Sequence, residues 1–238
     1  MRGVALIIAV AACAPGAGVT ASPSPPGPAP LPAAGLVAPG EQMVWEVFWQ
    51  GLAIGRADLA VDAAGVRASF ATGRLARAVA NVRYELATTL VDRTARHAVE
   101  QVNAAARTEI AIEGAHYAIA GGGRGEVPGG TGLHTLTSGL GAVRAWAAPG
   151  AGPAYAWMIV DGGLYRLDVA APVSEALDGQ ATLRIDGVVR ALDPAGDTAD
   201  LTLWLSARAD RTPLRIVVSA RGERIVAQLA ETTLEGQR

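Results

Sequence analysis

The chain has 238 residues, of which 18% are charged, and its formal net charge is −2 at pH 7. All 20 basic residues are arginines, and they are spread along the chain without the basic run of a nucleic-acid-binding protein, so we expect no nucleic-acid partner. A single cysteine, Cys13, excludes an intrachain disulfide framework.

The N-terminal thirteen residues combine one positive charge with a short apolar run and a cysteine. Arg2 precedes the apolar segment Val4 to Val10, and Val10-Ala11-Ala12-Cys13 resembles the lipobox of bacterial lipoproteins. The apolar run is much shorter than the roughly 20 residues that a membrane-spanning helix needs. We therefore expect residues 1–12 to be a removed signal peptide and Cys13 to receive lipid. An ordinary secretory signal with an incidental cysteine is the alternative.

Residues 13–39 have the composition of a tether. They hold eight of the chain's 14 prolines and no charged side chain, and such a segment buries too little apolar surface to fold by itself. Ala14, rather than an aspartate, follows the cysteine, which favours an outer-membrane address facing the periplasm. The sequence thus predicts a lipid-anchored protein of the bacterial cell envelope, with the membrane as a partner through its anchor.

Residues 40–238 have the length of one domain, and most of it shows the period-two alternation of β-strands. Asp161-Gly162-Gly163 supplies the positive φ angles of a tight hairpin. A turn is expected over 51–55, a long loop over the glycine-rich residues 121–132, and further turns over 193–196 and 211–213. The expected strands are 42–49, 56–62, 82–90, 96–103, 106–113, 116–120, 155–160, 164–170, 182–192, 200–207, 214–220 and 224–231.

One segment departs from the strand pattern. Apolar residues recur at helical spacing from Leu133 to Ala147, and Thr131 is available as the cap. The pattern predicts a mainly β fold: a single antiparallel β-barrel, or a strongly curved half-barrel, of about ten strands with one short helix.

Three segments together resemble one protein family. Gly40 to Val47, followed by Gly51 to Gly55, is similar to the opening strand and turn of the DUF3108 family of bacterial exported proteins. His134 to Arg144 resembles the central helix of that family, and Leu203 to Ser206 with Pro213 to Ile216 resembles its closing hairpin. The resemblance implies a β domain over residues 40–238 and an exported protein. It implies no activity, because the function of the family is unknown.

Acidic residues of the family pattern are replaced at two places in this chain. The acidic pair after the closing Trp-Leu-Ser is replaced by Ala207-Arg208, and the helix's aspartate is replaced by Thr135.

The sequence offers no catalytic, metal or cofactor motif, and we expect none of the three. His97, His116 and His134 lack the i, i+4 spacing of two metal ligands on one helix. Ser138 lies outside a G-x-S-x-G elbow, and the glycine-rich stretch from residue 121 lacks the lysine and helix start of a phosphate-binding loop.

The aromatic residues suggest an apolar site. Trp45 and Trp49 fall on one face of the first strand, and Trp157 lies on a later strand. We take these three tryptophans as candidates for a cavity that binds an apolar or lipid-like ligand, although a plain packed core would use them equally. The alternative function is a protein-protein interaction module of the envelope with a closed core, and hydrolysis is the third and weakest option.

Overall fold

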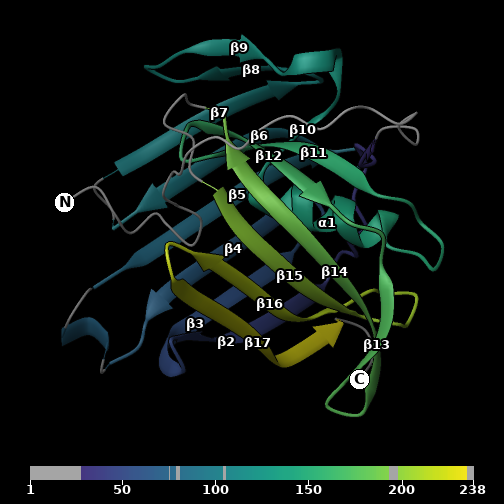
Figure 1. Ribbon diagram of the computed structural model, residues 1–238. Coiled ribbons are helices and arrows are strands. Elements are labelled where there is room, and N and C mark those ends of the chain that lie inside the picture. The colour runs from purple at the N-terminus through teal and green to yellow at the C-terminus, as the bar shows by residue number, and fades with distance from the viewer. Residues whose placement is uncertain (1–27, 75, 79–80, 104–105, 193–197, 235–238) are drawn as a thin grey trace, which may run out of the picture.

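The computed structural model describes residues 28–234, except 75, 79–80, 104–105 and 193–197. The described chain is mainly β, with one α-helix and two short 3-10 helices (Figure 1). The elements of the first half are β1 (Ala29–Pro30), β2 (Glu41–Trp49), β3 (Leu52–Val61), β4 (Gly65–Thr72), η1 (Ala76–Ala78), β5 (Arg83–Val91), β6 (Thr94–Val102), β7 (Ala106–Glu113), β8 (His116–Ile119), β9 (Arg124–Glu126) and η2 (Pro128–Gly130).

The second half contains the α-helix and the longest strands. Its elements are β10 (Leu133–His134), α1 (Leu136–Trp146), β11 (Ala154–Val160), β12 (Gly163–Val169), β13 (Val173–Leu177), β14 (Gln180–Ala191), β15 (Thr198–Ser206), β16 (Pro213–Ala220) and β17 (Glu223–Leu234). The predicted mainly β class with one α-helix is confirmed, but the expected ten strands are too few, since the described sheet has 17.

All of these strands belong to one sheet. From β11 it runs through β12, β14, β15, β16 and β17, then crosses to β2 and continues in chain order to β9. These neighbours are antiparallel, β13 pairs with β14 beyond the end of β12, and the two-residue strands β1 and β10 pair in parallel with β11. The pairing of β17 with β2, in which Val226 lies opposite Phe48, joins the two halves of the chain.

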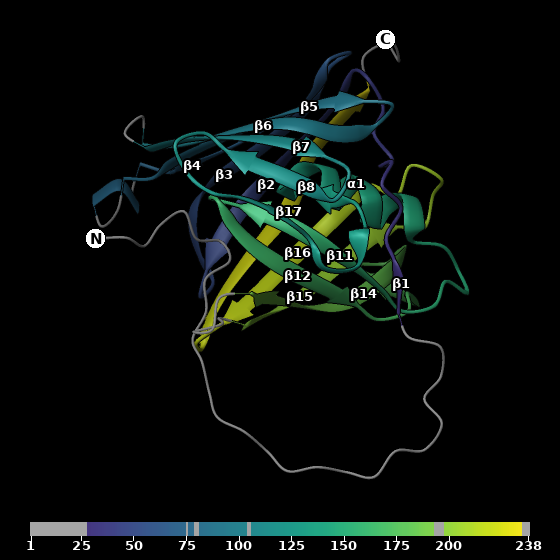
Figure 2. The same ribbon diagram turned by 90° about the horizontal axis from the view of Figure 1, so that it is seen from above.

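The sheet is open and barrel-like, and strands β5 to β7 pack over β11. Adjacent residues of a strand point to opposite faces. In β11, Met158 packs in the core cluster that contains α1, whereas Trp157 and Ile159 pack with Leu86 of β5 and Ile110 of β7. One face of β11 therefore packs toward α1, and the other face packs against β5 to β7. The sheet thus coils until β5 to β7 lie over β11 (Figure 2). We call this contact the overlap.

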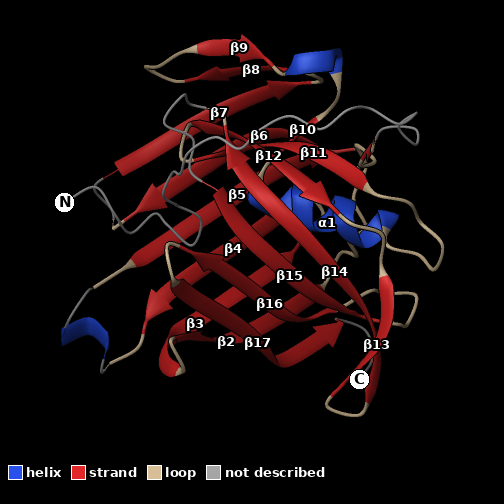
Figure 3. Ribbon diagram, viewed as in Figure 1, coloured by secondary structure: helices blue, strands red, loops and turns tan. Residues whose placement is uncertain are grey.

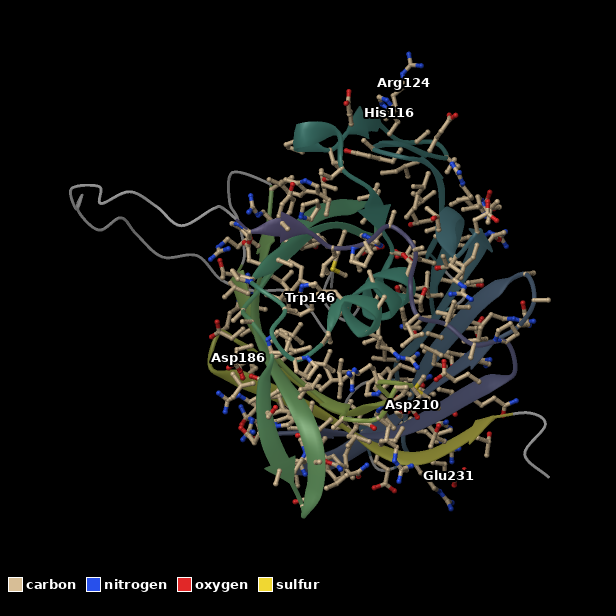
Figure 4. All side chains as sticks on the ribbon, turned by 90° about the vertical axis from the view of Figure 1, so that its right-hand side faces the viewer. His116, Arg124, Trp146, Asp186, Asp210 and Glu231 are labelled. Atoms are coloured by element: carbon tan, nitrogen blue, oxygen red, sulfur yellow. The ribbon has the colours of Figure 1, made fainter. Side chains whose placement is uncertain are left out.

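The helix α1 lies inside the coil (Figures 3 and 4). Its cap is Thr135, whose hydroxyl accepts the Ser138 N–H while the Ser138 hydroxyl accepts the Thr135 N–H, a reciprocal arrangement that satisfies two free backbone donors. The predicted cap Thr131 was wrong, because Leu133 and His134 pair with β11 before the helix begins. The Leu36 N–H donates to the Gly141 carbonyl over 2.8 Å, so the N-terminal segment crosses the helix.

Three other local expectations also need correction. The turn expected over 51–55 is confined to Gln50 and Gly51, and Gly55 lies within β3, where a Cβ would come within 2.3 Å of the Ala71 carbonyl oxygen. Residues 121–132 contain β9 and η2 instead of one long loop. The strand β4 was not anticipated. The expected turn over 193–196 lies outside the described residues.

Candidate ligand-binding inner wall

The strand register defines which side chains face the inside of the coil. Two rows of residues run across β15, β16, β17 and β2 on the same face as the α1 contacts. One row consists of Leu203, Ile216, Ala227 and Val47, and the next consists of Leu201, Val218, Ile225 and Trp49. Both rows are apolar throughout, so this face of the sheet offers no polar side chain along them.

Several of these inward-facing side chains are only half-buried, although they sit in the middle of a concave sheet. Leu201, Ile216, Ile225 and Ala227 keep partial solvent access, as do Leu140 of α1 and Val160 of β11. A strand in the middle of a sheet has its backbone paired on both sides, and the exposed surface must therefore be mainly that of the side chains. Consequently, the rest of the fold does not fully cover these side chains. We call the residues Leu140, Val160, Leu201, Ile216, Ile225 and Ala227 the inner wall.

One end of the coil carries three tight turns next to the inner wall. They are Gln50–Gly51 between β2 and β3, Asp161–Gly162 between β11 and β12, and Arg221–Gly222 between β16 and β17. We call this end the rim. The predicted Asp-Gly hairpin turn is confirmed, with both residues at positive φ. The opposite end holds the C-terminus of α1, where the Arg211 guanidinium donates to the Ala147 carbonyl over 2.9 Å.

The three predicted cavity tryptophans lie in three different places. Trp45 is buried beside Met43 and Leu59, and its indole N–H donates to the Pro213 carbonyl over 3.0 Å. Trp157 is buried in the overlap, and its indole N–H donates to the Pro128 carbonyl over 3.0 Å.

Trp49 ends the second inward row at the rim, where 41% of it is exposed, and its indole N–H donates to the Glu223 carboxylate over 2.5 Å. The structure thus does not bring the three indoles into one pocket.

The inner wall was missed at the sequence level for a physical reason. Its members are leucine, isoleucine, valine and alanine in ordinary strand alternation, and that alternation shows that one face is buried without showing what covers it. No single residue type distinguishes a half-filled interior from a packed one.

A buried polar group closes the overlap near the rim. The Glu100 carboxylate of β6 accepts the backbone N–H of Asp161 at the tip of the β11–β12 hairpin. Burial raises the pKa of Glu100 to about 7, and the nearby Asp161 charge adds to this. The pKa values of Tyr84 and Asp161 are also raised, chiefly by burial. Tyr84 and Glu100 therefore share a poorly solvated space that disfavours their charged forms, whereas Asp161 is exposed at the tip of its hairpin.

The hydroxyl and imidazole groups around the start of α1 serve the fold. Thr88 of β5 hydrogen-bonds through its hydroxyl to those of Thr135 and Thr137, each over 2.9 Å. Burial lowers the pKa of His134 to about 4, so its imidazole is neutral at pH 7. The Ser138 hydroxyl is engaged in the helix cap rather than aimed at a base.

The described residues form no metal site, and the two large grooves lie away from the predicted tryptophans. The three histidines occupy β6, β8 and β10, and no group of three or more histidine, cysteine or carboxylate residues among the described ones could hold a metal ion. Two surface grooves have volumes of about 740 and 700 Å³, one over β6 to β9 and one beside the β13–β14 turn. None of the three predicted tryptophans lines either groove.

No helix in the described parts of the chain has both the length and the apolar character needed to cross a membrane.

Comparison with known proteins supports the fold. No protein-family model matches the chain, and no curated protein matches it. Among solved structures, it is similar to a β-barrel-like protein of the domain of unknown function DUF1849 from Brucella abortus, with a TM-score of 0.55 and 8% identity over 83% of this chain and 98% of the other. A likeness at this identity shows a shared barrel-like fold and nothing about activity.

Two mycobacterial proteins align over much of the chain with low scores. The lipoprotein LppX of Mycobacterium tuberculosis gives a TM-score of 0.29 and 13% identity over 84% of this chain and 88% of its own. LprF from Mycobacterium bovis gives a TM-score of 0.26 and 16% identity over 81% of this chain and 85% of its own.

Proposed function

We propose that this protein is a lipid-anchored module of the bacterial cell envelope that binds the acyl chain of a lipid-like ligand against its inner wall. The observation that carries the proposal is the half-buried state of inward-facing apolar residues such as Leu201, Ile216 and Ala227. Apolar side chains that remain accessible on a concave surface are stabilised by an apolar ligand that removes them from water.

The anchoring part of the proposal rests on the sequence. Cys13 and the signal peptide of residues 1–12 lie outside the described residues, and the proline-rich segment 13–39 is described only from residue 28. The lipobox-like motif supports lipidation, and Ala14 supports placement at the outer membrane, facing the periplasm. The resemblance to the DUF3108 family supports export, and we propose membership of that family on the three segments that carry it.

The proposed role is binding without catalysis. The polar groups buried near the interior belong to a helix cap, an ion pair and the overlap, and each makes at least one hydrogen bond within the fold. The atoms Glu100 Oε1 and Arg144 Nε are buried without a hydrogen-bond partner among the described residues. The alternative role, an interaction module with a closed core, requires inward residues that are fully packed. The partial exposure of Ile216 and Ala227 favours the ligand-binding role instead.

The test fills the interior with one added side chain. Ala227→Phe places a ring among the inward rows, whereas Ser219→Phe places the same ring on the outer face, where Ser219 lies opposite Asp200 and Arg224. Binding of a dansyl-labelled undecanoic acid is followed by its fluorescence. We expect Ala227→Phe to weaken binding by about tenfold or more, because it occupies the space that the acyl chain needs, and Ser219→Phe to bind like the wild type.

A second measurement is made on the wild-type protein purified from a bacterial periplasm without detergent. Organic extracts are examined by mass spectrometry, and a stoichiometric lipid that is depleted in Ala227→Phe supports the proposal. If the wild type carries no lipid and does not bind the dansyl probe while it is fully folded, the proposal is wrong, and the interaction role becomes the better one.

A further inference from the structure

Two large apolar side chains are exposed side by side at the rim. Trp49 and Leu52 pair across the β2–β3 turn, and 41% of Trp49 and 67% of Leu52 is exposed. The neighbouring β16–β17 turn fixes this turn in position. The Gln50 side-chain amide donates to the Gly222 carbonyl over 3.0 Å, and the Trp49 indole donates to Glu223. We call residues 49–52 the apolar tip.

Two segments next to the apolar tip carry arginines. The Gln50 N–H donates to the Arg224 carbonyl over 3.0 Å, and the Gly73 N–H donates to the Ile54 carbonyl over 2.7 Å. These bonds bring the backbone of Arg224 and of the segment that holds Arg74 and Arg77 next to the tip. The register directs the Arg224 side chain to the outer face of β17, opposite to the face that Trp49 and Ile225 share. Arg74 and Arg224 are exposed and have no carboxylate partner among the described residues. The one carboxylate on the adjoining turn, Glu223, is engaged with Trp49.

We propose that the apolar tip and its arginines form a docking surface for an anionic lipid bilayer. Tryptophan prefers the interface between water and hydrocarbon, and an exposed leucine beside it gains by leaving water. Arginines near a membrane surface are attracted to anionic headgroups. An apolar projection with cations on the neighbouring segments is complementary to such a surface.

The apolar tip lies next to the inner wall. Trp49 continues the inward row that contains Ile225 and Leu201, so a bilayer at the tip lies next to the inner wall. A lipid could then pass between the membrane and the interior along one apolar surface. This last step rests on the proposed function, whereas docking itself does not.

The test uses the chain from residue 13 onward with Cys13→Ser, so that no acyl anchor contributes to membrane binding. Flotation is measured with vesicles of phosphatidylethanolamine and phosphatidylglycerol in a 3:1 ratio, and with vesicles of phosphatidylcholine alone. We expect binding to the anionic vesicles that weakens in high salt, and little binding to phosphatidylcholine.

Two variants and one control assign the effect to the tip. Leu52→Ser and the double variant Arg74→Gln/Arg224→Gln should each reduce binding to anionic vesicles by about tenfold. Val91→Ser removes another exposed apolar side chain, 47% exposed at the end of β5 that lies away from the rim, and should change binding less. Equal binding by the wild type, Leu52→Ser and the arginine variant, or no binding by the wild type, overturns the docking proposal.

The two proposals can fail separately. The dansyl fatty acid is titrated into Leu52→Ser in solution, without vesicles. Normal probe binding with lost vesicle binding supports a docking surface distinct from the inner wall. Vesicle binding by a wild type that does not bind the probe keeps the docking surface and removes the lipid-transfer role.

Discussion

Arg144 of α1 and Glu41 of β2 form a buried ion pair with two hydrogen bonds, of 2.9 Å and 2.6 Å. Only 3% of the arginine side chain and 4% of the glutamate side chain are exposed. The guanidinium also donates to the Asp210 carbonyl over 2.8 Å. The pair therefore fixes the central helix to the first long strand and to the β15–β16 loop, across 103 residues of sequence.

Removing one partner of this pair should destabilise the fold strongly. Glu41→Leu leaves the guanidinium buried without its counter-charge, and the expected cost is about 3–5 kcal/mol in the free energy of unfolding. Urea denaturation measures it. The double variant Glu41→Leu/Arg144→Met removes both charges and should recover a large part of that loss. If the double variant is less stable than Glu41→Leu alone, the loss of stability comes mainly from the lost ion pair and not from the unpaired buried charge.

The stability of the protein should fall as the pH rises from about 5 to 8. Glu100 has a pKa of about 7 in the folded state, above the usual value of 4.5 in the unfolded chain. Between these two values the folded state binds more protons, so its stability decreases with pH and the decrease is complete above pH 7. Glu100 should account for a loss of about 2–3 kcal/mol. The raised pKa of Asp161 acts in the same direction.

Glu100→Gln isolates this effect. The amide stays neutral and can still accept the Asp161 N–H, so the variant should show a much smaller decline between pH 5 and 8. Hydrogen exchange at the Asp161 amide, measured at both pH values, locates the change. Identical pH profiles for the wild type and Glu100→Gln would show that the overlap does not depend on the charge of Glu100.

The anchor can be tested on the intact chain in a bacterial host. The mature wild-type protein should begin at Cys13 and carry the mass of its acyl chains. Cys13→Ser should lack that mass and leave the membrane fraction after a high-salt wash, which also removes proteins held only by charge. A wild-type protein that starts at another residue and carries no lipid would favour the ordinary secretory signal.

The sequence determined the local structure where the pattern of side chains is itself sufficient. Period-two alternation located β2, β7 and most other long strands within a few residues, and the Asp161-Gly162 pair specified its turn because both residues adopt positive φ. The helix was also predicted, although its cap was not, since pairing of Leu133 with β11 decides where the helix begins.

Tertiary structure decided the strand count, the layers and the site. The two-residue strands β1 and β10 exist only because β11 offers an edge to pair with, and no local pattern encodes that edge. Alternation shows that Trp157 and Met158 face opposite ways, but only the coil of the sheet places one in the overlap and the other against the helix.

The same reason separates the three predicted tryptophans from one another. The burial of a strand residue depends on which element packs against its face of the sheet, and that element is distant in the sequence.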